Sequence, residues 1–345
     1  MTLSAPAIWF GFLVCLALIF FSGTHLSRYG HQIAIRTGLG ATWVGVVLVA
    51  GVTSLPELVT GISSITVVNA PDLAVGDALG SCIVNLMIIV ILDFIHRRDS
   101  IYTHMHQGHI LSAGFGVVLL GTAAGAIILQ RQFSSLAFFH VGLLSLVTPL
   151  IYLIAMRAVF SYEQRERKSR LAEVAEVLEA QAAGKRDLTL GQIYFRYALN
   201  AGVIMVAGIA LPIVGEQLAA VMGWEQTFVG TVFLAVATSV PEVVISVEAV
   251  RIGSVDLAIG NILGSNLFNL LILTLDDFVY TDGILLADAN FQHLFTAIAA
   301  LTMTGVVIVG LLYRPRGRVL RLVGWVSLGL FTVGLLNAVV LFLLN

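Results

Sequence analysis

The chain of 345 residues is too apolar to be a water-soluble protein. Hydrophobic residues make up 58% and charged residues 11% of it, and the mean hydropathy is +0.98, whereas soluble domains carry about 25% charged residues. The net charge of -2 excludes a nucleic-acid binder, which needs a basic surface, and the low charge excludes a disordered chain. Two cysteines, Cys15 and Cys82, lie in apolar segments, so we expect neither a disulfide framework nor a zinc site.

Ten apolar runs, each bounded by Gly, Pro or charged residues, indicate membrane-spanning helices. They cover residues 6–24, 38–67, 72–95, 108–129, 136–160, 192–221, 227–250, 256–279, 291–313 and 320–343. The long polar interval 161–187 separates five runs from five, and its apolar residues recur at helical spacing. We expect this interval to form a short amphipathic helix at the membrane surface, with a solvated linker as the alternative.

The basic residues are distributed unevenly between the connecting loops. Of the 18 Lys and Arg residues, 17 lie in the odd-numbered loops, and only Arg131 lies in an even-numbered one. Because cytoplasmic loops carry the excess of basic residues, both termini should lie on the non-cytoplasmic side. A prokaryotic plasma (inner) membrane is the simplest location to expect.

The two halves of the chain contain a repeat. Residues 44–57 align with 229–242, with eight of 14 positions identical, and residues 72–86 align with 256–270, with nine of 15 identical. Since each half has five spans, an odd number, the second copy enters the membrane from the opposite face. Inverted repeats of this kind are typical of alternating-access transporters, whose substrate site lies between the copies near the bilayer midplane.

The predicted fold is therefore an all-α integral membrane protein whose ten transmembrane helices form two inverted five-helix repeats. The expected parts are a first repeat (1–160, motif segment 44–86), a cytoplasmic linker (161–190) and a second repeat (191–345, motif segment 229–270).

The repeats share polar residues that are costly to bury in a membrane. Glu57 and Glu242 stand in long apolar runs at matching positions, so each needs a cation or a proton. Pro56 and Pro241 precede them and should kink their helices, freeing backbone oxygens. Hydroxyl and amide groups recur at helical spacing beside the carboxylates, namely Thr53, Ser54, Ser81 and Asn85 in the first copy and Thr238, Ser239, Ser265 and Asn269 in the second.

This residue set, with carboxylates, hydroxyls, amides and backbone carbonyls, forms a hard all-oxygen site. Ca²⁺ takes six to eight oxygen ligands, and two negative charges balance either one Ca²⁺ or two monovalent ions. For a single hydroxyl or amide, a role in helix-to-helix hydrogen bonding is the alternative. Gly76, Gly80, Gly260 and Gly264 should let helices approach closely next to the site.

The segments TSLPE and TSVPE, with GDALGSCIVN and GNILGSNLFN, resemble the two α-repeats of the sodium/calcium exchanger family, in the calcium/cation antiporter superfamily. The resemblance implies that Glu57 and Glu242 ligate Ca²⁺. It also implies that the remaining Na⁺ and Ca²⁺ ligands are Thr53, Ser54, Thr238, Ser239, Ser81, Asn85, Ser265 and Asn269, together with the carbonyls of Ala50 and Ala235.

Three features depart from the family pattern. Val52 and Ala237 replace the usual Gly before Thr-Ser, Asn269 stands where many prokaryotic members have Asp, and Cys82 replaces the first Asn of GSN. Asp77, matched by Asn261, lies on the face of Ser81 and Asn85. It is a candidate ion ligand of the outward pathway, with a helix-start or hydrogen-bonding role as the alternative.

We expect a secondary active antiporter, not an enzyme, that exchanges Na⁺ for Ca²⁺ at one shared site by movement of a gating bundle that includes the first and sixth spans. An H⁺/Ca²⁺ antiporter is the alternative, although proton-coupled relatives tend to have Gly-Asn in place of Thr-Ser. A passive channel remains open in principle, and an intramembrane aspartyl hydrolase would need two facing Asp residues, whereas Asp77 is matched by Asn261. No cofactor, nucleic acid or partner protein is implied, and the partners are inorganic cations and the lipid bilayer.

Several polar residues outside the repeats' cores are expected to have ordinary roles. These are Asp72 and Asp256 as helix-start carboxylates, Asp93 with Arg97 and Glu248 with Arg251 as surface pairs, and His104, His106 and His109 in a solvated loop.

Overall fold

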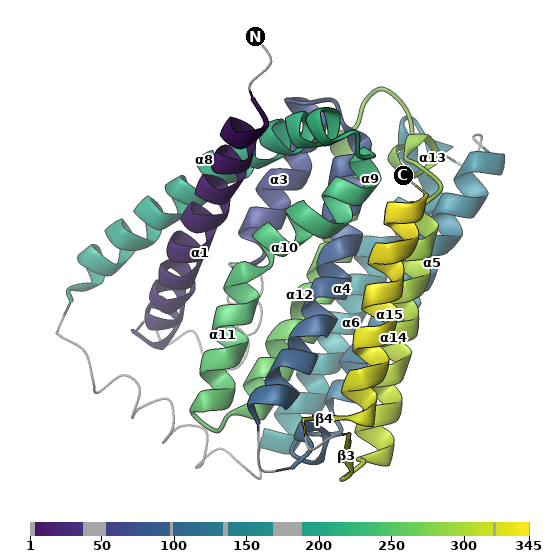
Figure 1. The fold of residues 1–345 in the computed structure, drawn as a ribbon. Helices are drawn as coiled ribbons and strands as arrows, with labels where there is room; N and C mark the ends of the chain where they lie inside the picture. The colour runs from purple at the N-terminus through teal and green to yellow at the C-terminus, as the bar shows by residue number, and fades with distance from the viewer. Residues whose placement is uncertain are drawn as a thin grey trace.

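A computed structural model of the chain describes residues 4–36, 53–96, 99–133, 137–167, 188–319 and 322–344. Within these ranges eight helices are long and apolar enough to cross a membrane, and a bent pair forms a ninth candidate span. The eight helices are α1 (Ala5–Arg36), α4 (Pro71–Ile95), α5 (His109–Gln132), α6 (Leu143–Arg167), α8 (Leu190–Met222), α12 (Val255–Val279), α14 (His293–Tyr313) and α15 (Trp325–Leu343). They form one helical bundle, with both chain ends at the same end of it (Figure 1).

The remaining predicted spans are broken or partly outside the described residues. The run 227–250 consists of α9 (Gln226–Phe228), a π-helical turn η3 (Val229–Leu234), α10 (Ala235–Thr238) and α11 (Val240–Arg251). The run 38–67 is represented by α3 (Leu55–Thr66), because residues 37–52 lie outside the described part of the chain. The predicted linker helix also lies largely outside it, and residues 161–167 continue α6.

Two apolar runs begin with a β-hairpin instead of a helix. Strands β1 (Ala137–Phe138) and β2 (Val141–Gly142) precede α6, and strands β3 (Arg318–Val319) and β4 (Val323–Gly324) precede α15. Both pairs are antiparallel, with Ala137 opposite Gly142 and Arg318 opposite Gly324. Hydropathy alone does not separate a short apolar strand from the first turn of a helix, so the sequence placed these helix starts too early.

Each hairpin is held by a buried carboxylate from the end of a central helix. Asp93 accepts hydrogen bonds from the backbone N–H of Gly324 at 2.6 Å and the hydroxyl of Ser327 at 2.7 Å. Asp277, the matching residue in α12, accepts from the backbone N–H of Gly142 at 3.0 Å. The expectation of a surface pair between Asp93 and Arg97 is therefore wrong for Asp93, which is fully buried and anchors β4.

The carboxylates at the starts of α4 and α12 connect the two repeats. Asp72 accepts from the backbone N–H of Asn290 at 2.6 Å and contacts the His293 ring at 3.0 Å. Asp256 contacts the His109 ring at 3.1 Å and accepts from the backbone N–H of His106 at 2.7 Å. The sequence had suggested that each carboxylate caps its own helix. Instead, each binds the start of a helix from the other repeat. His109 is accordingly buried, unlike the solvated loop residue expected.

Another expected surface pair changes its partner. Glu248 binds Arg28 of α1 at 3.1 Å, whereas the spacing had suggested Arg251. The bond joins α11 to α1 at the surface, where both side chains are about half exposed (45% and 54%).

Helices α4 and α12 lie at the centre, and glycines allow α4 to pack directly on η3. A Cβ atom on Gly80 would lie 2.4 Å from the carbonyl oxygen of Thr231, and one on Gly76 would lie 2.9 Å from its nitrogen. The predicted close approach is confirmed at these two glycines. At Gly260 the approach is ordinary, since the nearest atom, on the His109 ring, would be 3.7 Å away.

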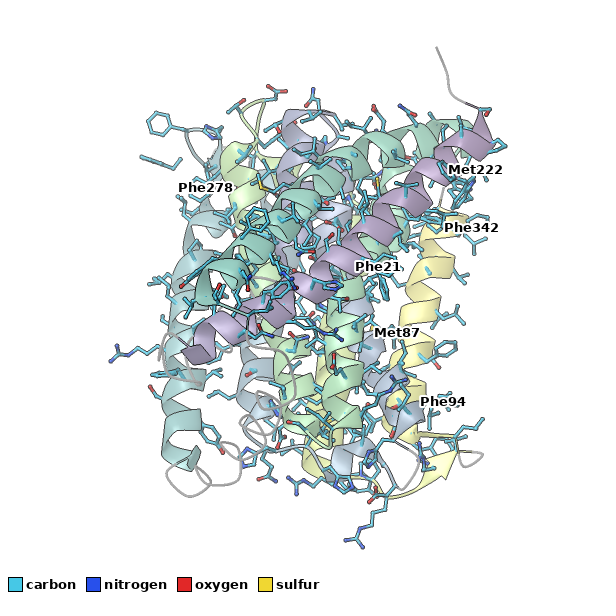
Figure 2. The ribbon with its side chains drawn as sticks, turned by 90° about the vertical axis from the view of Figure 1, so that its left-hand side faces the viewer. Phe21, Met87, Phe94, Met222, Phe278 and Phe342 are labelled. Atoms are coloured by element: carbon cyan, nitrogen blue, oxygen red, sulfur yellow. The ribbon has the colours of Figure 1, made fainter. Side chains whose placement is uncertain are left out.

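Helices α1 and α8 lie side by side and cross one face of the bundle at a slant (Figures 1 and 2). Large apolar side chains, including Phe21, Phe94 and Phe278, project outward from the helices and are between 43% and 62% exposed (Figure 2). An apolar outer surface of this extent suits contact with lipid and confirms the integral membrane fold.

Candidate functional site

The site begins where two helices are interrupted near their glutamates. Helices α10 and α11 meet at Ser239 with a bend of 45°. Pro241 and Pro56 stand in the first turn of α11 and α3, the helical position that tolerates a missing backbone N–H. The predicted kink is confirmed for the second repeat. In the first repeat, Ser54 has nearly the same backbone angles as Ser239, with φ -87° against -81°.

The two interrupted helices exchange hydrogen bonds across the repeats. Ser54 and Ser239 occupy the N-cap positions of α3 and α11, yet neither side chain caps its own helix. Ser54 Oγ instead donates to Glu242 Oε1 at 3.3 Å, and Ser239 Oγ donates to Glu57 Oε1 at 3.2 Å. Each carboxylate is thus oriented by a serine from the other repeat, and the pair of bonds follows the twofold relation of the sequence repeat.

Further hydroxyls surround this pair. Ser265 donates to Glu242 Oε1 at 3.3 Å, and Thr53 also hydrogen-bonds the Glu242 carboxylate. Thr238 donates to Asp77 Oδ1 at 2.9 Å, and its hydroxyl oxygen lies 3.4 Å from that of Ser81. The structure therefore gathers hydroxyl and carboxylate groups from both repeats, and the bond between Ser54 and Glu242 joins residues 188 positions apart.

Several buried polar atoms in this region have no hydrogen-bond partner among the described residues. They are the second carboxylate oxygens of Glu57 and Glu242 and both amide atoms of Asn85 and Asn269. All four side chains are fully buried. Because buried polar atoms are normally paired, such a concentration of unpaired oxygens indicates a place for a ligand.

The electrostatics favour a cationic ligand. Both glutamate carboxylates are inaccessible to solvent, and within the described residues no Lys, Arg or His forms an ion pair with either. Two carboxylates together with hydroxyl and amide oxygens offer hard ligands of the kind that Ca²⁺ and Na⁺ prefer. The same carboxylates can also be neutralised by protons.

Two matched pairs of residues differ between the repeats. Asp77 bonds the second repeat's Thr238, whereas its counterpart Asn261 donates to Ser246 Oγ at 3.2 Å within its own repeat. Cys82 and Asn266 occupy equivalent positions and contact each other's backbone, with Asn266 Nδ2 donating to the Cys82 carbonyl at 3.2 Å. The departure at Cys82 therefore lies at the contact between the central helices α4 and α12.

Of the two backbone carbonyls suggested as ligands, only that of Ala235 lies within the described residues. The carbonyl of Ala235 accepts hydrogen bonds from the Ser239 N–H at 3.1 Å and from the Thr238 hydroxyl at 3.3 Å, so it would have to exchange a bond to reach a cation. Ala50 lies outside the described residues.

One acidic residue of the region was not singled out by the sequence. Asp276 is fully buried in α12, and neither of its carboxylate oxygens has a hydrogen-bond partner among the described residues. Its position inside an apolar run is a usable signal. The other repeat has no acid at the matching position, so alignment of the repeats does not identify Asp276.

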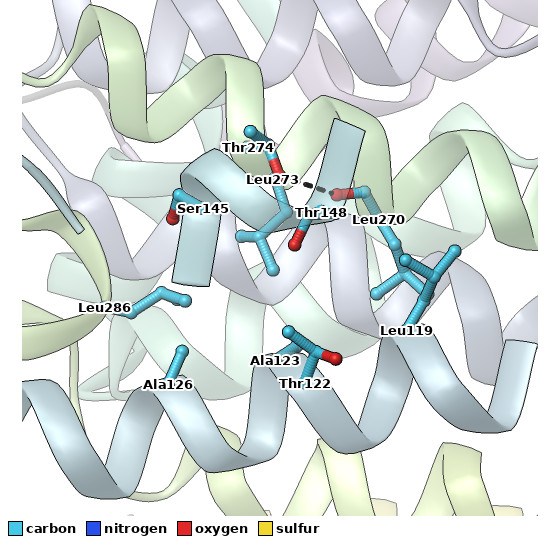
Figure 3. Close-up of a pocket in the computed structure, with 10 residues that line it drawn as sticks. All are labelled: Leu119, Thr122, Ala123, Ala126, Ser145, Thr148, Leu270, Leu273, Thr274 and Leu286. Atoms are coloured by element: carbon cyan, nitrogen blue, oxygen red, sulfur yellow. Dashed lines mark hydrogen bonds between the residues drawn. The ribbon is translucent and has the colours of Figure 1, made fainter. Parts of the chain in front are cut away.

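A cavity elsewhere in the bundle contains no carboxylate. It has a volume of about 10 Å³, about the space of one water, and is lined by residues of α5, α6 and α12 together with Leu286 of α13 (Leu285–Asp288) (Figure 3). Its polar groups are hydroxyls, among them Thr274, which donates to the Leu270 carbonyl at 3.3 Å. This cavity lacks the charge that a cation site requires.

Comparisons with known proteins identify the family of the chain. The family model described as "Sodium/calcium exchanger protein" matches residues 7–161 and 197–340, one segment in each half. The chain is 26% identical to the sodium/calcium exchanger MaX1 of Methanosarcina acetivorans over 323 residues, covering 86% of this chain and 89% of the relative. It is also 26% identical to the inner membrane protein YrbG of Escherichia coli over 263 residues, covering 76% of each.

Solved structures share the fold. The H⁺/Ca²⁺ exchanger CAX matches with a TM-score of 0.68 at 12% identity, covering 98% of this chain and 86% of the other. The sodium-calcium exchanger NCX_Mj matches with a TM-score of 0.58 at 16% identity, covering 96% of this chain and 98% of the other. Since the family model spans most of both halves, the chain belongs to the sodium/calcium exchanger protein family of membrane cation antiporters.

Proposed function

We propose that this protein exchanges Na⁺ for Ca²⁺ across the membrane through one site between Glu57 and Glu242. The observation that carries the proposal is the reciprocal bonding of Ser54 and Ser239 to these carboxylates. It leaves one oxygen of each glutamate without a partner within the described ranges. Two such carboxylates match the charge of one Ca²⁺ or two Na⁺ ions, so the ions compete for the same negative charge.

The remaining ligands in this proposal are the neutral oxygens around the carboxylates. Asn85 and Asn269 supply amide oxygens that have no partner among the described residues, and the hydroxyls and carbonyls implied by the family resemblance complete the set. Asp77 extends it on the α4 side through its bond to Thr238. No cofactor takes part, and the transported ions are the only small partners required.

We further propose that the chain consists of two five-helix halves, 1–160 and 191–345. The moving part is formed by α1 from the first half and α8 from the second. Both helices use a glycine to approach a site helix. A Cβ on Gly23 of α1 would lie 2.4 Å from Pro241 Cγ, and one on Gly208 of α8 would lie 2.9 Å from Val59 Cγ1. Displacement of this pair would therefore uncover the helix turns that carry Glu242 and Glu57, which are closed to solvent in this arrangement.

For the orientation, we propose that both termini lie on the non-cytoplasmic side of a plasma membrane. The support is the sorting of 17 of 18 basic residues to the odd-numbered loops.

H⁺/Ca²⁺ exchange is the second candidate, because the two buried glutamates can carry protons and the fold also resembles that of the exchanger CAX. Na⁺ is favoured by the hydroxyls of Thr53, Ser54, Thr238 and Ser239. These residues supply neutral oxygens that a sodium ion needs and a proton does not.

The central test is Ca²⁺ uptake into proteoliposomes with wild type and the variants Glu57→Gln and Glu242→Gln. Removing one partner of a buried charge pair costs about 2–5 kcal/mol, so apparent Ca²⁺ affinity should fall by at least about 30-fold in each variant. Glu248→Gln is the matched control, because Glu248 pairs with Arg28 at the surface. Undiminished uptake by the two site variants would disprove the proposed site.

The coupling ion is tested separately with the wild-type protein. Uptake of Ca²⁺ driven by an opposing Na⁺ gradient at equal pH on both sides supports sodium coupling. Uptake that needs a pH gradient and ignores Na⁺ would replace the proposal by H⁺/Ca²⁺ exchange, and uptake that needs neither gradient would indicate a passive pathway.

A further inference from the structure

Asp276 is an intramembrane carboxylate that the proposed site does not use. It lies in the last turns of α12, its side chain is inaccessible to solvent, and both of its carboxylate oxygens lack a hydrogen-bond partner among the described residues. An ionisable group at such a position is expensive to keep and is therefore a functional candidate.

The architecture of the repeat does not require an acid at this position. The neighbouring Asp277 corresponds to Asp93, and both anchor backbone N–H groups of a hairpin. By the same offset Asp276 corresponds to Leu92 of α4, which is equally buried. Since one repeat packs with a leucine here, Asp276 serves something other than packing.

Asp276 rests against α3 one helical turn from Glu57. A Cβ on Gly61 of α3 would be 2.5 Å from Asp276 Oδ2 and 2.7 Å from Oδ1, so the carboxylate rests directly against this glycine. Gly61 follows Glu57 by four residues, which places it on the same helix face about 6 Å along the axis. The hydroxyl of Thr60 and Oε2 of Glu57 also have no hydrogen-bond partner in the part of the chain that the structure describes.

The charged groups closest to Asp276 are acidic. Asp77 of α4 and Asp277 of its own helix interact with it electrostatically. On α3 the nearest acid is Glu57. On α11 the nearest acid is Glu242. It contacts α12 at Ser265, which lies three helical turns from Asp276.

Among the residues that the structure describes, the other packed elements provide no counter-charge. Arg131 of α5 stands over the Phe291 ring, 5.6 Å from its centre, and His109 pairs with Asp256 at the opposite end of α12. Arg157 of α6 is exposed, and Asp288 of α13 lies against Gly283. Strand β2 has no charged residue.

A metal cation is poorly served at this position, because ions of this class take about six oxygen ligands and Gly61 offers no side-chain oxygen. A proton needs a single oxygen. An isolated carboxylate among acidic neighbours is stabilised by binding one, and a divalent cation arriving nearby would favour its release.

We propose that Asp276 binds a proton when the site is closed, and that Ca²⁺ entering between Glu57 and Glu242 displaces this proton. The carboxylic O–H bond breaks, the proton passes to water, and the carboxylate remains. This coupling rests on the proposed Ca²⁺ site, whereas protonation of Asp276 does not. Because linkage is reciprocal, acid must weaken Ca²⁺ binding through Asp276.

The coupling is tested by measuring Ca²⁺ affinity of the purified protein at a series of pH values. In Asp276→Asn, and in Asp276→Leu, which copies Leu92, the slope of log affinity against pH should be smaller than in wild type by up to about one, a tenfold smaller change per pH unit. Asp282→Asn is the control, since Asp282 is exposed near the same helix end and should leave the slope unchanged. Equal slopes in wild type and both Asp276 variants would overturn the coupling.

Protonation itself is tested by infrared spectroscopy without Ca²⁺ at neutral pH. Wild type should show carboxylic acid C=O absorption that is weaker in Asp276→Asn by the contribution of one group, and Glu57→Gln should retain that contribution. Adding Ca²⁺ should diminish the band in wild type, provided that the protein binds Ca²⁺. A spectrum unchanged by Asp276→Asn would overturn protonation, and a band present in a protein that binds no Ca²⁺ would overturn the transport site instead.

Discussion

The packing of α4 on η3 predicts the effect of a single methyl group at Gly80. In Gly80→Ala the new Cβ would lie 2.4 Å from the carbonyl oxygen of Thr231, 2.7 Å from its Cα and 2.8 Å from Ala235 Cβ. A carbon atom and a carbonyl oxygen normally come no closer than about 3.3 Å. Two of the three obstacles are backbone atoms, so the helices must separate by about 1 Å.

This separation has both an energetic and a functional consequence. Overpacking typically costs about 1–3 kcal/mol, against which alanine returns about 1 kcal/mol of helix propensity. The Ser81 and Thr238 hydroxyls are already 3.4 Å apart, and the bond from Thr238 to Asp77 spans the same interface. A shift of 1 Å breaks the first contact and weakens the second.

We expect Gly80→Ala to lose up to about 2 kcal/mol of stability and to reduce Ca²⁺ uptake by about tenfold, as measured by thermal unfolding in detergent and by uptake into proteoliposomes. Gly125→Ala in α5 and Gly305→Ala in α14 are matched controls, because a Cβ at either glycine meets no atom within 4 Å. They should keep full uptake. If Gly80→Ala behaved like these controls, the close contact between α4 and η3 would not position the site.

Two further predictions concern carboxylates outside the site. Asp93→Asn replaces an acceptor of the Gly324 N–H and Ser327 hydroxyl bonds, so unfolding should become easier by about 1–3 kcal/mol, measured as a lower midpoint temperature, while the exposed Asp282→Asn leaves it unchanged. The His104 ring, 2.8 Å from Asp99, lowers the pKa of that carboxyl below its ordinary 3.8. The Asp99 carboxylate therefore stabilises the protein above about pH 4 and loses this contribution as the pH falls through its lowered pKa. Wild type should have a slightly higher midpoint temperature than Asp99→Asn at pH 6, small because the Asp99 side chain is 44% exposed, and the gap should close in strong acid. A gap that is the same at both pH values would contradict this reasoning.

Linear features of the sequence were sufficient to predict the spans and the repeat. Hydropathy acts over windows of about 20 residues, so the helices α4 and α12 lie within one residue of their expected ranges. The matching positions of Glu57 and Glu242 predicted that they would meet, and their serine bonds across the repeats place them together. The hairpins before α6 and α15 were missed, because their apolar residues continue the hydropathy of the following helix.

Long-range pairing was decided only by the tertiary structure. Periodicity and spacing report partners within one helix, so they suggested that Asp93 and Asp256 act locally, whereas both bind backbone N–H groups beyond their own helices. Asp276 needed the three-dimensional contact with Gly61 before its closeness to Glu57 became visible. The sequence by itself determined that the chain consists of apolar membrane-spanning helices and that Glu57 and Glu242 stand at matching positions, since both follow from local composition and from the repeat. Packing between segments far apart in the chain decided much of what the buried acids bind, because partners such as Ser54 of Glu242, Thr238 of Asp77 and Gly324 of Asp93 lie in the other repeat.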